Sequence, residues 1–307
     1  MAGGRSKAAD EWPTVALIVA FAVVWTAVVV GHASVPWWLS FPLLVFLGGL
    51  WLSIQHELLH GHPTRWNAVN TTMGFAPLAL WMPFVRYKAS HVQHHRSDLT
   101  DPFEDPESTY VDPAKWQAAG PIRRRVMLFE RTSPGRLTVG VVQVVGHFLL
   151  RDLHAIRNRH VWSAWAVHLP AAALVAWWLF VVVDVPTWEY VFGFVLGGVA
   201  CSALRSFVEH AAVLQGTRSA VIETNPVMAL LFLNNNLHHT HHADPDLPWF
   251  DIPARHRELG SNEIAAEGAG YYRGYGQVLR RYLVTPFSQP DHPLSPGARP
   301  VGSSGIS

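Results

Sequence analysis

The sequence is poor in charged residues and has almost no cysteine. Only 15% of its 307 residues are charged, and the formal net charge is +1, whereas a typical soluble domain has about 25% charged residues. The near-neutral balance argues against nucleic acid as a partner. The single cysteine, Cys201, excludes a disulfide framework, a CxxC redox pair and a thiolate metal site. Low charge and an apolar content of 50% favour a membrane protein.

Four long apolar segments support this interpretation. They cover residues 15–31, 35–54, 161–183 and 191–208. Each approaches the roughly 20 apolar residues that a membrane-spanning helix needs. Tryptophans lie near several of their ends, as an interfacial aromatic belt requires. We therefore predict an all-α integral membrane protein whose four transmembrane helices form two hairpins.

Lysine and arginine are unevenly distributed around these segments. The short links within each hairpin contain neither residue, whereas residues 55–136 contain eight arginines and two lysines, and residues 209–290 contain several arginines. By the positive-inside rule, the two termini and both long segments are cytoplasmic. The predicted layout is a cytoplasmic N-terminus at 1–13, one membrane domain at 14–290 and a flexible C-terminal tail at 291–307.

Three further apolar stretches are too short to span a membrane comfortably. They cover residues 76–85, 137–150 and 226–233. Segments of this length are more typical of interfacial or re-entrant helices. We expect such helices to accompany the four spans.

Histidine is concentrated in three clusters. The first contains His56 and His60 in QHELLHGH, and the other two share the pattern HxxHH. The HxxHH clusters consist of His91, His94 and His95 in SHVQHHRSD, and of His238, His241 and His242 in LHHTHH. Residues three and four apart share a helix face, so we expect each cluster to present its imidazoles to one point. Histidine is the commonest protein metal ligand, which makes the clusters candidate metal sites on the cytoplasmic side.

The number of clustered histidines indicates more than one metal ion. A catalytic zinc has three protein ligands, so eight imidazoles exceed what one tetrahedral zinc needs. Imidazole also suits Fe, Cu and Ni. His210, in RSFVEH at the end of the fourth apolar segment, is a ninth candidate, because an ionisable group at the end of a span is a functional hypothesis by default. Eight or nine imidazoles suit two ions.

Several polar residues near the clusters have roles that the sequence leaves open. His62 is placed to support a ligand, and His239 points away from its neighbours if its segment is helical. Residues 234–236 (Asn234, Asn235 and Asn236) would orient a ligand or a metal-bound water, or would cap a helix. Carboxylates that orient ligand imidazoles are expected among Glu57, Asp98, Asp101, Glu209 and Asp244.

The clusters HELLH, HVQHH and HHTHH resemble the three histidine boxes of the integral-membrane fatty acid desaturase superfamily. The resemblance covers roughly residues 50–255, and DPFEDPESTY and NNNLHHTHHADPDLPWFDIP are most similar to bacterial acyl-lipid desaturases. It implies a cytoplasmic, histidine-rich di-iron cap on a bacterial inner-membrane protein. The iron ligands that it implies are His56, His60, His91, His94, His95, His210, His238, His241 and His242. The acyl-CoA branch differs, with HxxxxH as its first box and asparagine where Ser206 stands here.

The resemblance also implies a reaction and its co-substrates, namely O2-dependent desaturation of an acyl chain in a lipid. Removing hydrogen from an unactivated C–H bond is beyond acid–base groups, so a metal cofactor must perform it. The acyl chain would occupy a tunnel lined by the spans and roofed near Leu80 and Val144. Electrons would come from an external protein such as a ferredoxin, since no flavin, nicotinamide, iron–sulfur or haem motif is present. The arginines at 123–125 fit either such a donor or anionic headgroups.

Three other functions share parts of this pattern. Hydroxylases and carotenoid ketolases or hydroxylases share the boxes and the irons, so the motifs do not separate them from desaturases. HELLH also matches the HExxH pattern of zinc proteases, which would leave both HxxHH clusters unexplained. A metal transporter would place its site near the bilayer midplane, whereas these histidines flank the spans.

Overall fold

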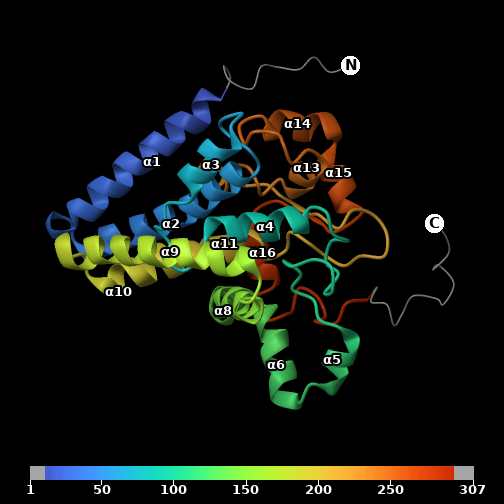
Figure 1. The fold of residues 1–307 in the computed structure, drawn as a ribbon. Helices are drawn as coiled ribbons and strands as arrows, with labels where there is room; N and C mark the ends of the chain where they lie inside the picture. The colour runs from blue at the N-terminus through green and yellow to red at the C-terminus, as the bar shows by residue number, and fades with distance from the viewer. Residues whose placement is uncertain (1–10, 294–307) are drawn as a thin grey trace.

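The computed structural model of the chain describes residues 11–293, and nearly all of its regular structure is helical (Figure 1). The expected flexible tail at 291–307 lies almost entirely outside the described residues. Most of the expected N-terminal segment at 1–13 lies outside them as well.

Four helices in the described residues are long and apolar enough to cross a membrane. They are α1 (Trp12–Val30), α2 (Trp37–Leu59), α9 with its π-helical continuation η2 (Arg159–Trp177, Trp178–Val182), and the continuous run of α10, π-helical η3 and α11 (Thr187–Glu189, Tyr190–Leu196, Gly197–Arg205). They form two consecutive pairs joined by short links, the first link being the 3₁₀ turn η1 (His32–Ser34) (Figure 1). This confirms the all-α architecture with four candidate spans.

The second candidate span is longer than the apolar segment that predicted it. α2 continues from Trp37 to Leu59, so the first histidine cluster begins inside its last turn rather than after it. No glycine or proline interrupts the helix between Gly49 and Gly61. Gly61 then adopts a φ of 96°, the left-handed conformation that commonly ends a helix. The helix therefore extends beyond the predicted span at 35–54, because polar QHELLH continues it past the apolar run.

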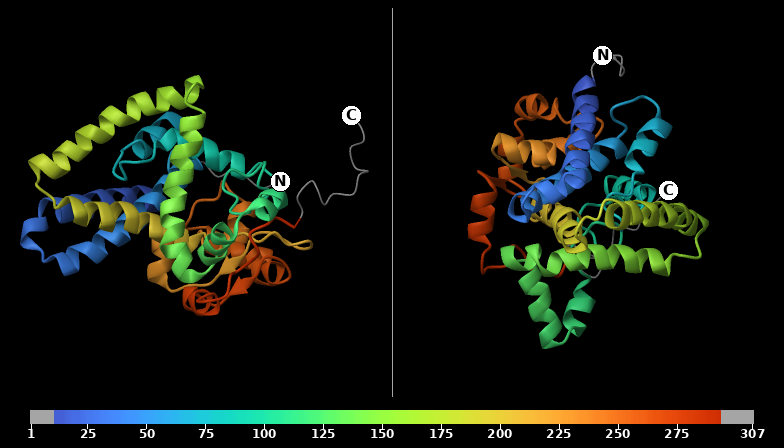
Figure 2. Two further views of the ribbon diagram at one scale, coloured as in Figure 1. Left: turned by 90° about the horizontal axis from the view of Figure 1, so that it is seen from below. Right: turned by 90° about the vertical axis from the view of Figure 1, so that its left-hand side faces the viewer.

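Two of the three shorter apolar stretches are helical. The stretch at 137–150 belongs to α8 (Val139–His154), and the stretch at 226–233 forms α12 (Pro226–Phe232). Figure 2 shows α8 lying crosswise to α9, beside the ends of the spans.

The prediction of a helix at 76–85 is wrong, because the chain is irregular from Ala76 to Pro83. Two prolines and a positive φ of 66° at Leu80 prevent a regular helix there. Two spans satisfy carbonyl groups of this irregular backbone. His168 of α9 donates from Nε2 to the Leu80 oxygen at 2.9 Å, and the Tyr190 hydroxyl donates to the Leu78 oxygen at 3.0 Å. Irregular backbone is tolerated at membrane depth when protein groups satisfy it in this way.

The remaining elements lie at one end of the spans, with α5 and α6 projecting away from the others (Figure 1). They are α3 (Asn67–Gly74), α4 (Phe84–His94), α5 (Pro113–Ala118), α6 (Pro121–Glu130), α7 (Ser133–Leu137), α13 (His238–Ala243), α14 (Ile252–Leu259), α15 (Ser261–Ala266) and α16 (Tyr275–Arg281). Two short strands, β1 (Val221–Ile222) and β2 (Tyr271–Tyr272), pair in parallel with Val221 opposite Tyr271. The pair ties the segment after α11 to the C-terminal part of this cap.

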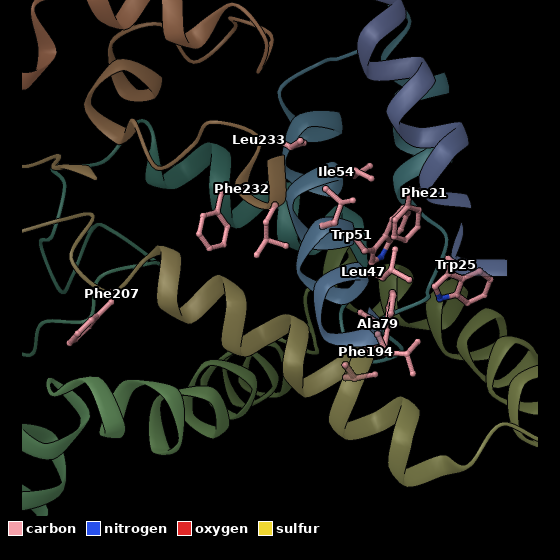
Figure 3. Close-up of a cluster of buried hydrophobic side chains, with 14 of the residues drawn as sticks. Phe21, Trp25, Leu47, Trp51, Ile54, Ala79, Phe194, Phe207, Phe232 and Leu233 are labelled. Carbon is pink, nitrogen blue, oxygen red and sulfur yellow. The ribbon is translucent and has the colours of Figure 1, made fainter. Parts of the chain in front are cut away.

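α2 is the central helix of the membrane part and approaches α11 closely at glycines. A Cβ on Gly48 would lie 2.0 Å from the Phe194 carbonyl oxygen, and one on Gly198 would lie 2.6 Å from the Gly48 carbonyl carbon. On another side of α2, the Trp51 ring stacks on Phe21 of α1 with ring centroids 5.3 Å apart (Figure 3). This packing fixes the position of the helix that ends in the first histidine cluster.

We predict that Gly48→Ala destabilises the protein. The added methyl group would overlap the Phe194 backbone and force the two helices apart, and overpacking of this kind costs about 1 to 3 kcal/mol. Thermal unfolding of the purified protein in detergent, followed by tryptophan fluorescence, should show a midpoint lowered by several degrees.

Gly146→Ala in α8 is the matched control, because a Cβ there would meet nothing within 4 Å. Its unfolding midpoint should stay at or slightly above that of the wild type, since alanine favours a helix over glycine. Equal losses for the two variants would contradict the close packing of α2 on α11.

Candidate metal centre

Nine histidines form two adjacent groups at the end of α2. In each group the imidazole nitrogens that face inward lie within 4.8 Å of one another. The five-histidine group contains His56, His60, His91, His95 and His241, and the four-histidine group contains His94, His210, His238 and His242. All nine histidines that the sequence proposed as metal ligands are therefore brought together.

Each HxxHH cluster divides its histidines between the two groups. In α4, His91 and His95 belong to the five-histidine group while His94 faces the other; in α13, His241 alone joins the five-histidine group. The expectation that each cluster converges on one point is confirmed for His56 and His60 but is wrong for the two HxxHH clusters. On a helix, residues four apart nearly align, whereas adjacent residues diverge by about 100°. The pair four apart thus faces one group and the third imidazole faces the next.

His210 occupies an extended segment rather than the end of a span. α11 ends at Arg205, and His210 forms an isolated antiparallel bridge with Ser219. Its Nδ1 lies 3.2 Å from the Arg218 carbonyl oxygen, to which it donates. Its Nε2 lies 2.9 Å from Nε2 of His238. A backbone turn thus delivers His210 to the four-histidine group.

Two carboxylates orient imidazoles of the second cluster from a following loop. Glu107 Oε1 accepts a hydrogen bond from His91 Nδ1 at 2.9 Å, and Asp105 Oδ1 accepts one from His94 Nδ1 at 2.7 Å. A proton on Nδ1 leaves the lone pair on Nε2, which is the atom that faces the group. The two acids therefore select the tautomer that suits a metal ligand.

Asn235 connects the two groups. Its side chain is buried, its Oδ1 accepts from His238 Nδ1 at 3.1 Å, and its Nδ2 lies 3.2 Å from His56 Nε2. The neighbouring Asn234 and Asn236 donate to backbone carbonyl oxygens instead, those of Trp249 and Ile222. None of the three asparagines caps α13, whose N-cap is Leu237.

The carboxylates expected from sequence proximity mostly have other partners. Glu209 approaches a candidate ligand imidazole, with its Oε1 3.5 Å from His238 Nδ1. The other four make these contacts: Glu57 Oε1 accepts from the Trp249 amide at 3.0 Å, Asp98 pairs with Arg218 at 2.6 Å, Asp101 accepts from the Phe103 amide at 2.8 Å, and Asp244 pairs with Arg255.

Sequence reasoning missed Asp105 and Glu107, although both stand in DPFEDPESTY. The loop at 98–107 folds back onto α4 and brings these two acids, further along the chain, to the rings of His91 and His94. The available signal was an acid-rich loop directly after a histidine cluster.

His62 and His239 lie outside both groups. His62 Nδ1 contacts the Glu11 carboxylate at 2.9 Å, which links the start of α1 to the turn after α2. His239 Nδ1 lies 2.9 Å from the Ser261 hydroxyl. His239 thus faces α15 while its neighbours in α13 face the two groups.

The inward nitrogens of the five-histidine group fit a cation. Nε2 of His91 lies 2.9 Å from that of His56 and 3.0 Å from that of His95. Because His91 Nδ1 donates to Glu107, its Nε2 directs a lone pair into the group, as a metal ligand must. Within residues 11–293, the buried Nε2 of His60 has no hydrogen-bond partner.

Burial keeps His95 and His210 in the neutral form that metals bind. Desolvation, followed by the neighbouring His91, lowers the pKa of His95 to about 3. Desolvation and His94 likewise lower the pKa of His210 to about 3. An all-imidazole donor set suits Fe, Zn, Cu and Ni, and five plus four donors suit two ions better than a single tetrahedral zinc.

Comparison with known families agrees with this site. The sequence model of the family described as fatty acid desaturase matches residues 33–275, a stretch that contains all nine histidines. The chain belongs to the fatty acid desaturase family. The resemblance of the three histidine boxes is thereby confirmed, and this family member is of the desaturase or hydroxylase type. No curated protein sequence matches the chain.

We predict that Asp105→Asn weakens metal binding by the four-histidine group. The amide cannot stabilise His94 as the charge of Asp105 does, and loss of such a partner typically costs about tenfold to a hundredfold in metal affinity. Competition with a chelator, followed by elemental analysis, would measure the loss.

Glu104→Gln provides a matched control, because Glu104 lies in the same loop as Asp105 and its side chain is exposed. Its metal affinity should match that of the wild type. If the two variants retain metal equally, Asp105 does not orient a ligand.

Proposed function

We propose that this protein is a membrane-bound, di-iron, O2-dependent desaturase that introduces a double bond into the acyl chain of a lipid. The observation that supports this most is the pair of adjacent all-histidine groups at the end of a candidate span, within a chain of the fatty acid desaturase family. Such a site places redox metals where an apolar chain in the bilayer can reach them.

In this proposal the five-histidine and four-histidine groups each hold one iron. Bound and reduced, the irons would supply the O2-derived oxidant that removal of hydrogen from an unactivated C–H bond requires. The chain's own residues position them. Glu107 and Asp105 keep protons on Nδ1 of His91 and His94. Asn235 fixes the relative position of His56 and His238.

The substrate would approach from the spans. A cavity adjoins His56 between α2, α4, α11 and α12, lined in part by Ser53, Tyr87 and Ser202. Its volume is about 10 Å³, enough for about one water-sized molecule. Side chains must therefore move to admit an acyl chain, which we propose happens when the lipid binds.

The membrane arrangement belongs to the same proposal. We propose a multi-pass protein of the bacterial inner membrane with one membrane domain at 14–290, and with metal-binding segments at 55–136 and 209–290 on the cytoplasmic side. The uneven distribution of lysine and arginine supports this orientation. Electrons would come from an external protein such as a ferredoxin.

The geometry argues against a zinc protease of the HExxH type. In such an enzyme the glutamate acts as general base beside a zinc with few protein ligands. Here His56 and His60 share a group with three further histidines. Glu57 accepts a hydrogen bond from the Trp249 backbone instead of facing that group.

We predict two irons per chain, both needed for activity. A chelator should abolish product formation, and ferrous iron should restore it while zinc should not, because zinc has no redox chemistry. His241→Ala removes one donor from the five-histidine group and should lower the iron content and abolish activity. Elemental analysis of the purified protein measures the metal.

His239→Ala is the matched control in the same helix, since His239 contacts Ser261 rather than either group. It should retain both irons and wild-type activity. One zinc per chain, with peptide cleavage, would instead establish the protease.

The products identify the reaction. We predict that a bacterial host expressing the chain accumulates acyl lipids that lack two hydrogen atoms, and that a host expressing His241→Ala does not. Mass spectrometry detects the change, and fragmentation locates the double bond. Lipids that gain one oxygen atom would instead show a hydroxylase, and altered carotenoids in a pigmented host would show a ketolase or carotenoid hydroxylase.

A further inference from the structure

α6 is an amphipathic helix that stands outside the core. None of its 10 residues is buried. Ile122, Val126 and Phe129 are 76%, 40% and 45% exposed, and their spacing of four and three places them on one stripe of the helix. No other part of residues 11–293 covers this stripe enough to bury any of the three.

Two arginines flank the apolar stripe while a third faces away from it. At about 100° per residue, Arg123 and Arg125 fall on either side of the stripe and Arg124 falls opposite. The structure agrees, because the Arg124 guanidinium donates to the carbonyl oxygens of Trp116 and Gln117 in α5 and stacks 5.3 Å from the Trp116 ring. α5 thus holds α6 in a fixed rotation that leaves the stripe exposed.

α8 continues this surface toward the spans. Val142, Leu150 and Leu153 are 69%, 53% and 63% exposed, and α8 lies crosswise to the spans (Figure 2). A turn after His154 leads directly into α9, the third candidate span. α8 therefore lies at the level where that span begins, which is the boundary between membrane and water.

We propose that α6 and α8 form a lipid-binding surface that lies in the interface of an anionic bilayer. The stripe of α6 enters the acyl boundary, and Arg123 and Arg125 contact headgroup phosphates with their apolar stems along the lipid. An acidic electron donor would match the arginines, but it would not account for the apolar stripe of α6 or for the exposed apolar side chains of α8, which leads into a span. This inference does not depend on the proposed reaction.

Site-specific fluorescence in phospholipid nanodiscs tests the proposal. Cys201 is the only cysteine, so Cys201→Ala gives a background for labelling Ile122→Cys with a polarity-sensitive fluorophore. The full-length protein is placed in discs of phosphatidylcholine or of phosphatidylcholine with phosphatidylglycerol. Nitroxide-labelled lipids quench a fluorophore in the bilayer, and iodide quenches one in water.

The label on α6 is expected to be quenched by nitroxide lipids and protected from iodide in discs with phosphatidylglycerol. Glu258→Cys in α14, whose native side chain is 65% exposed, is the control and should show the reverse. Arg123→Gln with Arg125→Gln should lower the lipid quenching, since each cation near an anionic surface changes partitioning by about fivefold. Phe129→Cys, on the same stripe, replaces Ile122→Cys if that variant does not fold.

Three outcomes would overturn the proposal. Iodide quenching at Ile122 equal to that at Glu258 would place α6 in water. Lipid quenching that is independent of phosphatidylglycerol and of both arginines would show that the arginines do not contact anionic headgroups. Protection from iodide that requires an added acidic ferredoxin, without lipid quenching, would reassign the surface to the electron donor.

Discussion

The close approach of the imidazole nitrogens is the constraint on which this structure depends. Nε2 of His91 lies 2.9 Å from that of His56 and 3.0 Å from that of His95, and it keeps a lone pair directed at them because His91 Nδ1 donates to Glu107. The fold must therefore hold these rings together before any metal arrives. It does so with Glu107 and Asp105 on the outer nitrogens, with Asn235 between the groups, and with a rigid helix beneath His56. Metal binding then adds its free energy to folding.

The glycine contact between α2 and α11 also helps to hold the histidines in place. Gly48 and Gly198 bring α2 against α11 so closely that no side chain separates their backbones. α2 delivers His56 and His60, and the chain that leaves α11 delivers His210. The distance between the two histidine groups is thus partly set inside the membrane, away from the histidines themselves. The packing of the spans therefore helps to determine the geometry of the histidine site.

Much of the architecture was predictable because periodicity and composition express it directly. Four apolar runs became the four candidate spans, and all nine clustered histidines came together. Element ends were less predictable. α2 extends through Leu59 because a helix can continue in polar sequence until Gly61, and residues 76–83 are irregular because of their prolines. A hydropathy profile alone predicts neither the end of α2 nor the irregular segment.

The contacts around the histidines depended on tertiary arrangement, which spacing does not encode. Asp105 and Glu107 reach the rings because a loop folds back on α4, so nearness in sequence selected Asp98 and Asp101 instead. The division of each HxxHH cluster between the two histidine groups was equally unpredictable from the sequence. The spacing predicts that the three imidazoles of a cluster lie on neighbouring faces of a helix. Which imidazole joins which histidine group depends on where the second helix lies.

That division has a consequence for how the two groups behave. α4 contributes two histidines to the five-histidine group and one to the other, and α13 contributes them in the opposite proportion. A rotation of either helix that improves one group therefore displaces a ligand of the other. The two groups cannot adjust independently, because they share both helices and Asn235. This coupling follows from residues three and four apart on two facing helices.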